Sequence, residues 1–153
     1  MDNKLIYEFS SQKTDGDASL SNLLGGKGAN LAEMSKLGIQ VPPGFTITTE
    51  ACNYFSKNKK LPDGLKEEII NYVSNLESLS QKSFGNSESP LLLSVRSGGM
   101  ISMPGMMDSI LNIGLNDDNV QSLGKAFNDE RFALDSYRRL IQMYSNEIGR
   151  AHV

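Results

Sequence analysis

Three short stretches rich in apolar and β-branched residues predict β-strands. Residues 5–9 form the first stretch, and residues 45–48 form the second, which follows the rigid Pro-Pro-Gly turn at residues 42–44. The run 91–95 predicts a third strand, and its apolar character indicates that this strand is buried.

Apolar residues at helical spacing predict helices between and after these strands. One helix runs from Ala29 to a stop at Gly38, and Thr49 is the expected N-cap of the next. The apolar positions between residues 63 and 84 lie on one face of a long helix. Three more helices are predicted: a short one over 108–113 ending at Gly114, one over 120–127 favoured by Asp117 and Asp118, and one from about residue 129. The fold class is therefore α+β and helix-rich.

The last predicted helix has one charged face and one apolar stripe. Asp135 and Arg139 are spaced i, i+4 and are expected to pair on the exposed side. Helical arginines usually lie on a solvated face, which favours a structural role for Arg138 and Arg139 over ligand binding. The apolar stripe includes Tyr137, Ile141 and Tyr144.

Composition narrows the class of protein. The 153 residues suit one domain, and the net charge of −3 gives no basic surface for nucleic acid or anionic lipid. A single cysteine, Cys52, excludes an internal disulfide and suits a reducing compartment. The N-terminus lacks a signal pattern, and no apolar run approaches the ~20 residues of a membrane span. We therefore expect a cytoplasmic protein.

The C-terminal hexapeptide, residues 148–153, follows a strongly periodic helix and ends abruptly. We expect it to be an artefactual tail and the domain to comprise residues 1–147, although an ordinary frayed end accounts for the same residues. The distinction bears on His152, which is the only histidine of the chain.

The sequence GGKGAN at residues 25–30 stands at the start of the helix that ends at Gly38. Glycines there let the main chain approach an anion, which the first N–H groups and the positive end of the helix dipole then hold. Lys27 adds a charged donor. A P-loop has Ser or Thr where Gly28 stands, and the dinucleotide fingerprint has a glycine where Leu31 stands, so neither motif is present. From these residues alone, a simple chain reversal with a solvated lysine is the preferred interpretation.

A second glycine-containing segment, SVRSGGMISMPGMM at residues 94–107, overlaps the end of the predicted strand 91–95. It contains Arg96, three glycines, one proline and four methionines. Considered alone, this composition favours methionines that fill gaps in the core. In the same interpretation, Arg96 forms an ion pair with a nearby carboxylate.

Together the two segments resemble the nucleotide-binding portion of the pyruvate phosphate dikinase family. The resemblance rests on LLGGKGANLAEMSKLGIQVPPGFTITTEAC at 23–52, SVRSGGMISMPGMMDSILNIGLND at 94–117 and FALDSYRRLIQMYSN at 132–146. It covers nearly the whole chain up to about residue 147. Phosphoenolpyruvate synthases share the GGKGAN and PPGF elements but look different after the arginine, where they have an acidic and alanine-rich segment.

The resemblance implies an enzyme that forms phosphoenolpyruvate, AMP and diphosphate from pyruvate, ATP and phosphate. It further implies magnesium, a phosphohistidine intermediate, a homodimeric full-length protein and an ATP-grasp fold, of which this chain is the helix-rich first part. By this resemblance Lys27 and Arg96 bind the ATP phosphates. Phosphoryl transfer requires that the negative charge of these phosphates be neutralised. The phosphate-loop candidates are Gly25, Gly26, Gly28, Ser97, Gly98 and Gly105.

The resemblance also assigns a role to the methionines. Met103, Met106 and Met107 would cover the nucleotide with adaptable apolar surface and exclude water. One departure is that the family commonly has alanine and then often a basic residue where Gly99 and Met100 stand. This chain therefore lacks a charge that family members often have in the loop.

Other parts of the family's machinery have no counterpart in the sequence. His152 lacks the motif that surrounds the carrier histidine, and Asp108, Asp117 and Asp118 are explained equally well as helix starts. We expect the magnesium ligands in a missing part of the protein, and the isolated chain to be inactive, with weak or undetectable ATP binding. Truncation would also leave the apolar stripe exposed and favour instability or self-association. The alternatives are a stand-alone binding or regulatory module and a related dikinase such as phosphoenolpyruvate synthase.

Overall fold

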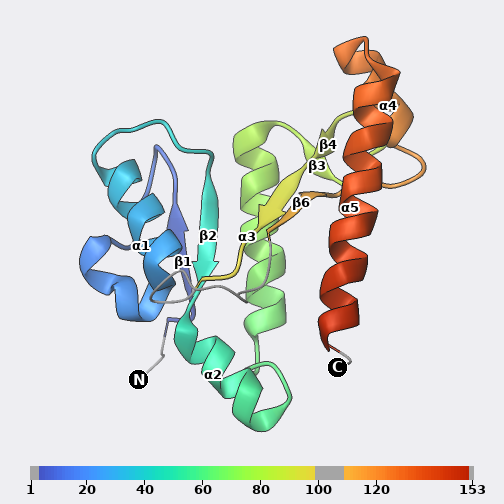
Figure 1. Ribbon diagram of the computed structural model, residues 1–153. Helices are drawn as coiled ribbons and strands as arrows, with labels where there is room; N and C mark the ends of the chain where they lie inside the picture. The colour runs from blue at the N-terminus through green and yellow to red at the C-terminus, as the bar shows by residue number, and fades with distance from the viewer. Residues whose placement is uncertain (1–3, 99–108, 152–153) are drawn as a thin grey trace. The chain divides into compact units, whose positions relative to one another are not determined.

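The computed structural model of the chain describes residues 4–98 and 109–151 (Figure 1). These residues form two compact units, one of residues 4–79 with Gly98 and one of residues 80–97 with 109–151. Helices and small two-stranded sheets occur together, which confirms the α+β class. Among the described residues, no helix combines the length and the apolar character that a membrane span needs.

A two-stranded antiparallel sheet lies at the centre of the first unit. β1 (Ile6–Phe9) pairs with β2 (Gly44–Ile47), with Ile6 opposite Ile47 and Phe9 opposite Gly44. Both strands were predicted to within one residue. A Cβ at Gly44 would lie 2.7 Å from the Phe9 ring, so a larger residue opposite this phenylalanine would force the ring to move.

Helices cover both faces of this sheet. The helical segments of the unit are η1 (Ala18–Leu20), α1 (Ser21–Lys36), α2 (Thr49–Asn58) and α3 (Leu65–Ser80). Successive strand residues point to opposite faces. Phe45 packs against Tyr72 of α3, with ring centroids 5.4 Å apart, whereas the next residue, Thr46, lies against Gly28 of α1 (Figure 1). The buried residues Ile6, Ala51 and Leu65 complete the core on the Phe45 side.

The start of α2 differs from the prediction by one residue. Thr48, not Thr49, is the N-cap: its backbone is extended and its hydroxyl accepts a hydrogen bond from the Ala51 N–H at 3.4 Å. The Thr48 N–H also donates to the Leu5 carbonyl, which holds Thr48 in the extended conformation that a cap requires. The predicted stop of α1 is confirmed, because Gly38 has a φ of 76° just after its last residue.

The second unit contains β3 (Ser83–Phe84), β4 (Pro90–Leu91), β5 (Leu93–Val95), β6 (Ile110–Ile113), α4 (Val120–Phe127) and α5 (Glu130–Ala151). The predicted strand 91–95 is divided, since β4 pairs in parallel with β3 while β5 pairs antiparallel with β6. Leu91 is buried, but Val95 is 54% exposed. The expected burial is therefore wrong at this end, because the β5–β6 sheet has only two strands.

The helix predicted over 108–113 is wrong where the chain is described. Residues 110–113 form a strand instead, with Ile110 opposite Val95 and Ile113 opposite Leu93. Pairing with β5 suits the β-branched isoleucines and overrides their modest helix propensity. Gly114, with a φ of 114°, still ends the element as predicted, and Asp108 lies outside the described residues.

The two C-terminal helices pack closely against each other. A Cβ at Gly124 of α4 would lie 3.2 Å from the Glu130 Cα of α5, and the buried core beside them consists of Leu115, Val120, Leu123 and Ala133. The bounds of α4 match the prediction, and α5 begins within one residue of it. Because α5 continues to Ala151, the proposed tail at 148–153 begins inside this helix.

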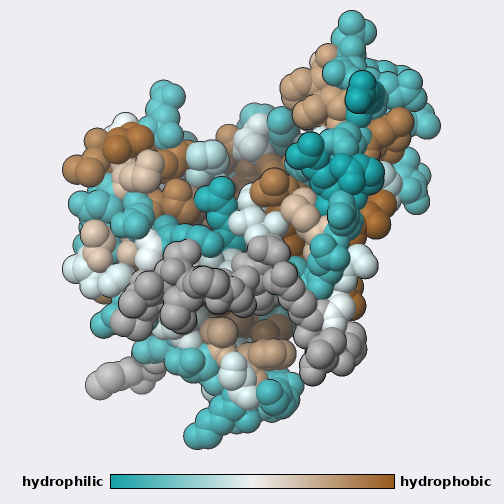
Figure 2. Space-filling model, viewed as in Figure 1, coloured by the Kyte–Doolittle hydropathy of each residue, from teal (hydrophilic) through white to brown (hydrophobic). Residues whose placement is uncertain are grey.

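The exposed face of α5 carries the predicted ion pair. The Asp135 carboxylate accepts hydrogen bonds from Arg139 and Arg138, each at 2.7 Å, and these bonds lower the pKa of Asp135. Figure 2 shows a largely hydrophilic surface over α5 on the face in view. The apolar stripe is exposed as expected at Ile141 and Tyr144, each 54%. Tyr137 differs, since it packs on the core and donates its hydroxyl proton to Asp117 at 2.9 Å, which raises the tyrosine pKa.

A fully buried asparagine organises the second unit. The Asn119 side chain accepts from the Asn116 N–H at 2.8 Å and donates to the carbonyls of Gly114, at 2.8 Å, and Asn86, at 3.2 Å. One side chain thereby joins the loop before β4, the end of β6 and the start of α4.

We expect Asn119→Ala to destabilise the second unit by about 2–4 kcal/mol, because three main-chain groups lose the partner that this buried side chain gives them. Urea unfolding of the chain measures this change. Asn146→Ala, at an exposed position of α5, is the matched control and should change stability by less than about 0.5 kcal/mol. An equal effect of both substitutions would contradict the assigned role of Asn119.

The nearly buried carboxylate of Asp15 likewise connects separate parts of the chain, beside β1. The Asp15 carboxylate accepts from the Glu8 N–H at 3.2 Å and pairs with the Lys4 ammonium at 2.7 Å. Burial alone would raise the pKa of Asp15, but the Lys4 and Glu8 hydrogen bonds and the Lys13 charge hold it below its ordinary value of 3.8.

We expect Asp15→Asn to destabilise the chain at pH 7 more than at pH 3. A depressed folded-state pKa stabilises the fold above the ordinary pKa, and this stabilisation is lost as the pH falls through the folded-state pKa. Thermal unfolding of both proteins at the two pH values tests this. Asp63→Asn, at a carboxylate 94% exposed, is the control. A stability difference independent of pH would show that the Asp15 charge contributes nothing.

Candidate functional site

The glycine turn at the start of α1 reverses the chain. Gly25 has φ 68° and ψ 163°, values that interrupt the helix between Leu24 and Gly26. The segment before it runs back along the helix that follows, since the Ala18 N–H donates to Glu33 at 3.1 Å and Asp17 pairs with Lys36 at 2.9 Å. Residues 26–36 therefore form a helix whose N-terminal end lies at the turn.

The Asp17 carboxylate, in the segment that precedes the glycine turn, is neutralised by neighbouring donors. The Ser19 hydroxyl and main-chain N–H and the Lys36 ammonium donate hydrogen bonds to the Asp17 carboxylate, and together they lower its pKa to about 2. Because Lys36 belongs to the last turn of α1, this carboxylate lies at the end of the helix remote from the glycine turn.

Two of the predicted phosphate-loop glycines meet in the structure. A Cβ built on Gly25 would lie 3.1 Å from the carbonyl carbon of Gly98 and 3.2 Å from its Cα. Glycine suits position 25 for two reasons. An L-residue with a side chain would be strained at this positive φ, and its Cβ would press on the Gly98 main chain. A Cβ on Gly98 would lie 3.6 Å from the Leu24 oxygen, which is an ordinary contact. The structure therefore brings together one glycine from each of the two segments that the sequence identified.

The other residues of the turn have different surroundings. Gly26 and Lys27 are half-buried in the first turn of the helix that follows Gly25. Gly28 is buried, and a Cβ there would lie 2.7 Å from the Thr46 methyl group and 3.3 Å from the Leu24 Cβ. Close packing against β2 therefore explains Gly28 without a ligand.

Arg96 follows β5 at the boundary of the second unit. The residue is exposed, and no carboxylate of the described residues forms an ion pair with it. The ion pair considered from the sequence is therefore not found within residues 4–98 and 109–151. Ser97, which is half-buried, connects Arg96 to Gly98.

The remaining loop predictions fall outside the described residues. They concern Gly99, Met100, Met103, Gly105, Met106 and Met107. The roles expected for Gly105 as a loop glycine and for the methionines as a nucleotide cover stay predictions.

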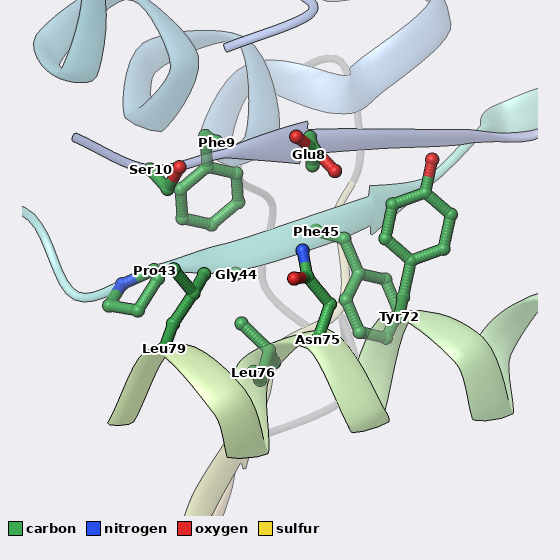
Figure 3. A pocket seen from close by; sticks show the side chains of 10 residues that line it. All are labelled: Glu8, Phe9, Ser10, Pro43, Gly44, Phe45, Tyr72, Asn75, Leu76 and Leu79. Atoms are coloured by element: carbon green, nitrogen blue, oxygen red, sulfur yellow. The ribbon is translucent and has the colours of Figure 1, made fainter. Parts of the chain in front are cut away.

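A small cavity among the described residues of the first unit cannot hold a nucleotide. It lies between β2 and α3, lined by Phe45, Tyr72 and Asn75 among others, and has a volume of about 10 Å³ (Figure 3). This volume holds roughly one water molecule. The cavity also lies on the α3 side of the sheet, whereas Gly28 and the glycine turn lie on the α1 side.

The described side chains form no metal-binding cluster. Within residues 4–98 and 109–151 no three His, Cys, Asp or Glu side chains are grouped so that they could hold a metal ion. Asp117 is engaged by the Tyr137 hydroxyl, and the Asp118 N–H donates to the Asn116 side chain. We therefore assign no magnesium ligand in the described part of the chain.

Sequence reasoning missed the threonines that hold the turn. Thr46 packs against Gly28, and the Thr49 hydroxyl donates to the Asn22 carbonyl at 2.8 Å. The alternation along β2 was a signal for Thr46, because it places this side chain opposite Phe45. No local pattern indicated the bond from Thr49 to Asn22.

Comparison with known proteins finds a family match over a region that includes the turn. The family described as "Pyruvate phosphate dikinase, AMP/ATP-binding domain" matches residues 21–85, which include α1, β2, α2 and α3. Proteins named pyruvate, phosphate dikinase are 54% identical in Rickettsia bellii, over 92% of this chain, and 51% identical in Clostridium symbiosum, over 97%. A chloroplastic form from Flaveria pringlei is 50% identical over 95% of the chain.

The chain spans only part of these relatives. It covers 16% of the Rickettsia protein, 17% of the Clostridium protein and 15% of the Flaveria protein. Over nearly its whole length the chain is similar to proteins of the pyruvate phosphate dikinase family, and residues 21–85 match the AMP/ATP-binding domain of that family.

Proposed function

We propose that the Gly25 turn and the segment from Arg96 to Gly98 bind the phosphates of ATP. The observation that carries this proposal is the close approach of the Gly25 and Gly98 main chains, with only 3.1 Å between a Gly25 Cβ position and the Gly98 carbonyl carbon. Main chain without side chains on both segments leaves room for phosphate oxygens to approach N–H groups. Gly26, Gly28 and Gly105 support the turn and the loop in this proposal.

Lys27 and Arg96 supply the positive charge. Lys27 stands in the first turn of the helix after Gly25, where the helix dipole also favours an anion. Arg96 is separated from Gly98 by one residue, which limits the distance between their Cα atoms to about 7 Å. A guanidinium offers phosphate two parallel hydrogen bonds, and Ser97 adds a hydroxyl donor. Both cations would act by positioning ATP and neutralising charge as it develops during phosphoryl transfer.

We further propose that this segment, residues 1–147, works as part of a full-length pyruvate phosphate dikinase. That protein would convert pyruvate, ATP and phosphate to phosphoenolpyruvate, AMP and diphosphate through a phosphohistidine carried on another domain. An ATP-grasp fold, a homodimer, a cytoplasmic location and Mg²⁺ ligands on the rest of the protein belong to the same proposal. The similarity to relatives of that name over 92–97% of the chain supports it. A stand-alone module or a phosphoenolpyruvate synthase receives no comparable support.

We expect Lys27→Ala and Arg96→Ala each to lower ATP-dependent phosphorylation of the carrier histidine in the full-length protein by about 10- to 150-fold. This is the loss of one charged hydrogen bond to phosphate, about 1.5–3 kcal/mol. Rapid-quench measurement of phosphoenzyme formation from labelled ATP tests it. Phosphorylation of the same histidine by phosphoenolpyruvate should change little, because that reaction does not use the ATP site.

Control substitutions show whether the effect is specific to the cations of the proposed site or follows from the loss of any exposed positive charge. Lys66→Ala and Arg131→Ala remove exposed cations in the first and second unit and should leave both partial reactions unchanged. Arg96→Lys keeps the charge but loses the planar fork, so an intermediate rate is expected. Equal loss of the ATP and phosphoenolpyruvate reactions in Lys27→Ala or Arg96→Ala would assign these residues to folding instead.

The two glycines give a further test, because only one of them is required by packing. Gly25→Ala should destabilise the turn, since alanine is strained at φ 68° and its Cβ meets Gly98. Gly98→Ala meets only an ordinary contact among the described residues and should leave the melting temperature unchanged. If phosphate approaches the main chain here, Gly98→Ala will still raise the KM for ATP. An unchanged KM in Gly98→Ala would remove this residue from the binding surface.

A further inference from the structure

The Thr49 hydroxyl makes a hydrogen bond that its own helix does not need. Thr49 is the first residue of α2, but the N-cap of that helix is Thr48, whose hydroxyl already accepts from the Ala51 N–H. The Thr49 Oγ1 instead donates to the Asn22 carbonyl oxygen at 2.8 Å. This bond joins the start of α2 to the first turn of α1, far away in the sequence.

The position of the acceptor explains the bond. Asn22 lies in the single helical turn before Gly25, where the helical conformation is interrupted. Carbonyl groups at the end of a helical segment lack some of their partners within the helix and need other donors. Thr49 provides one such donor, and so holds the chain on the entering side of the glycine turn.

A second threonine acts on the other side of the turn. Thr46 of β2 packs against Gly28, with 2.7 Å between its methyl group and a Cβ position on that glycine. Thr46 and Thr49 stand three residues apart at the junction of β2 and α2. One short segment therefore contacts the chain both before and after Gly25, while Gly98 lies against Gly25 itself.

We propose that Thr49 is a positioning residue for the phosphate-binding turn. It fixes the Asn22 carbonyl and thereby the direction in which the N–H groups after Gly25 point. Thr46 provides the opposing contact, so the turn is clamped from both sides before ATP binds. This inference rests on the proposed function of the turn in ATP binding.

The test compares Thr49→Val with Thr49→Ser in the full-length protein. Valine has the shape of threonine but donates no hydrogen bond, whereas serine keeps the hydroxyl. We expect Thr49→Val to lower kcat/KM for ATP in carrier-histidine phosphorylation by about 3- to 10-fold, the effect of one neutral hydrogen bond. Thr49→Ser should restore the value to within about twofold. The phosphoenolpyruvate partial reaction and the melting temperature should stay unchanged in both variants.

A matched control removes a similar bond elsewhere in the same unit. The Thr14 hydroxyl is within hydrogen-bond distance of the Ser10 carbonyl, at 3.2 Å, and of the Ser35 hydroxyl near the end of α1, at 3.0 Å. Both partners are remote from the glycine turn, so Thr14→Val should leave kcat/KM for ATP unchanged. Amide hydrogen exchange gives a second readout, since residues 25–29 should exchange faster in Thr49→Val than in the wild type.

The outcomes separate this inference from the proposed function. If Lys27→Ala impairs ATP use but Thr49→Val has wild-type kinetics and exchange, the positioning role is refuted and the phosphate site stands. Equal impairment in Thr49→Val and Thr49→Ser likewise refutes a role for the hydroxyl. If Lys27→Ala and Arg96→Ala both use ATP normally, the proposed function fails whatever Thr49 does.

Discussion

The main chain at Gly25 lies close to that of Gly98, so that a Cβ on Gly25 would lie only 3.1 Å from the Gly98 carbonyl carbon. Gly25 also has a positive φ, which interrupts α1 and turns the preceding segment back along it. The direction of the helix after the turn and the place of Lys27 in its first turn depend on this conformation. A glycine at position 25 is therefore a condition for the candidate site as well as for the local fold.

The two-stranded sheet behind this turn divides the first unit into two sides. On one side Phe45 and Tyr72 form an apolar contact between β2 and α3, next to a cavity that holds no more than a water molecule. On the other side the small residues Thr46 and Gly28 let α1 come close to β2. The apolar packing of α3 and the close approach of α1 thus place Gly28 and the glycine turn on the side of the sheet away from this cavity.

Periodicity identified most elements because they bury one regular face. Residues 5–9, 45–48 and 120–127 were predicted to within one residue for this reason. The stretch 108–113 was misread, because Ile110–Ile113 is too short for periodicity to distinguish a strand from a helical turn. The threonine pair showed a similar ambiguity: both residues are good caps, and only the bond from the Thr48 N–H to Leu5 selects one of them.

The sequence by itself determined the α+β class, the helix stop at Gly38, the pairing of Asp135 with Arg139 and the resemblance to the pyruvate phosphate dikinase family. These features follow from local conformational preferences and from motifs of adjacent residues. Only the tertiary structure showed that Gly25 meets Gly98, that Gly28 is small because of Thr46, and that Thr49 bonds to Asn22. Each of these contacts joins segments distant in sequence, and their distances depend on how β2, α1 and α2 pack rather than on any local pattern.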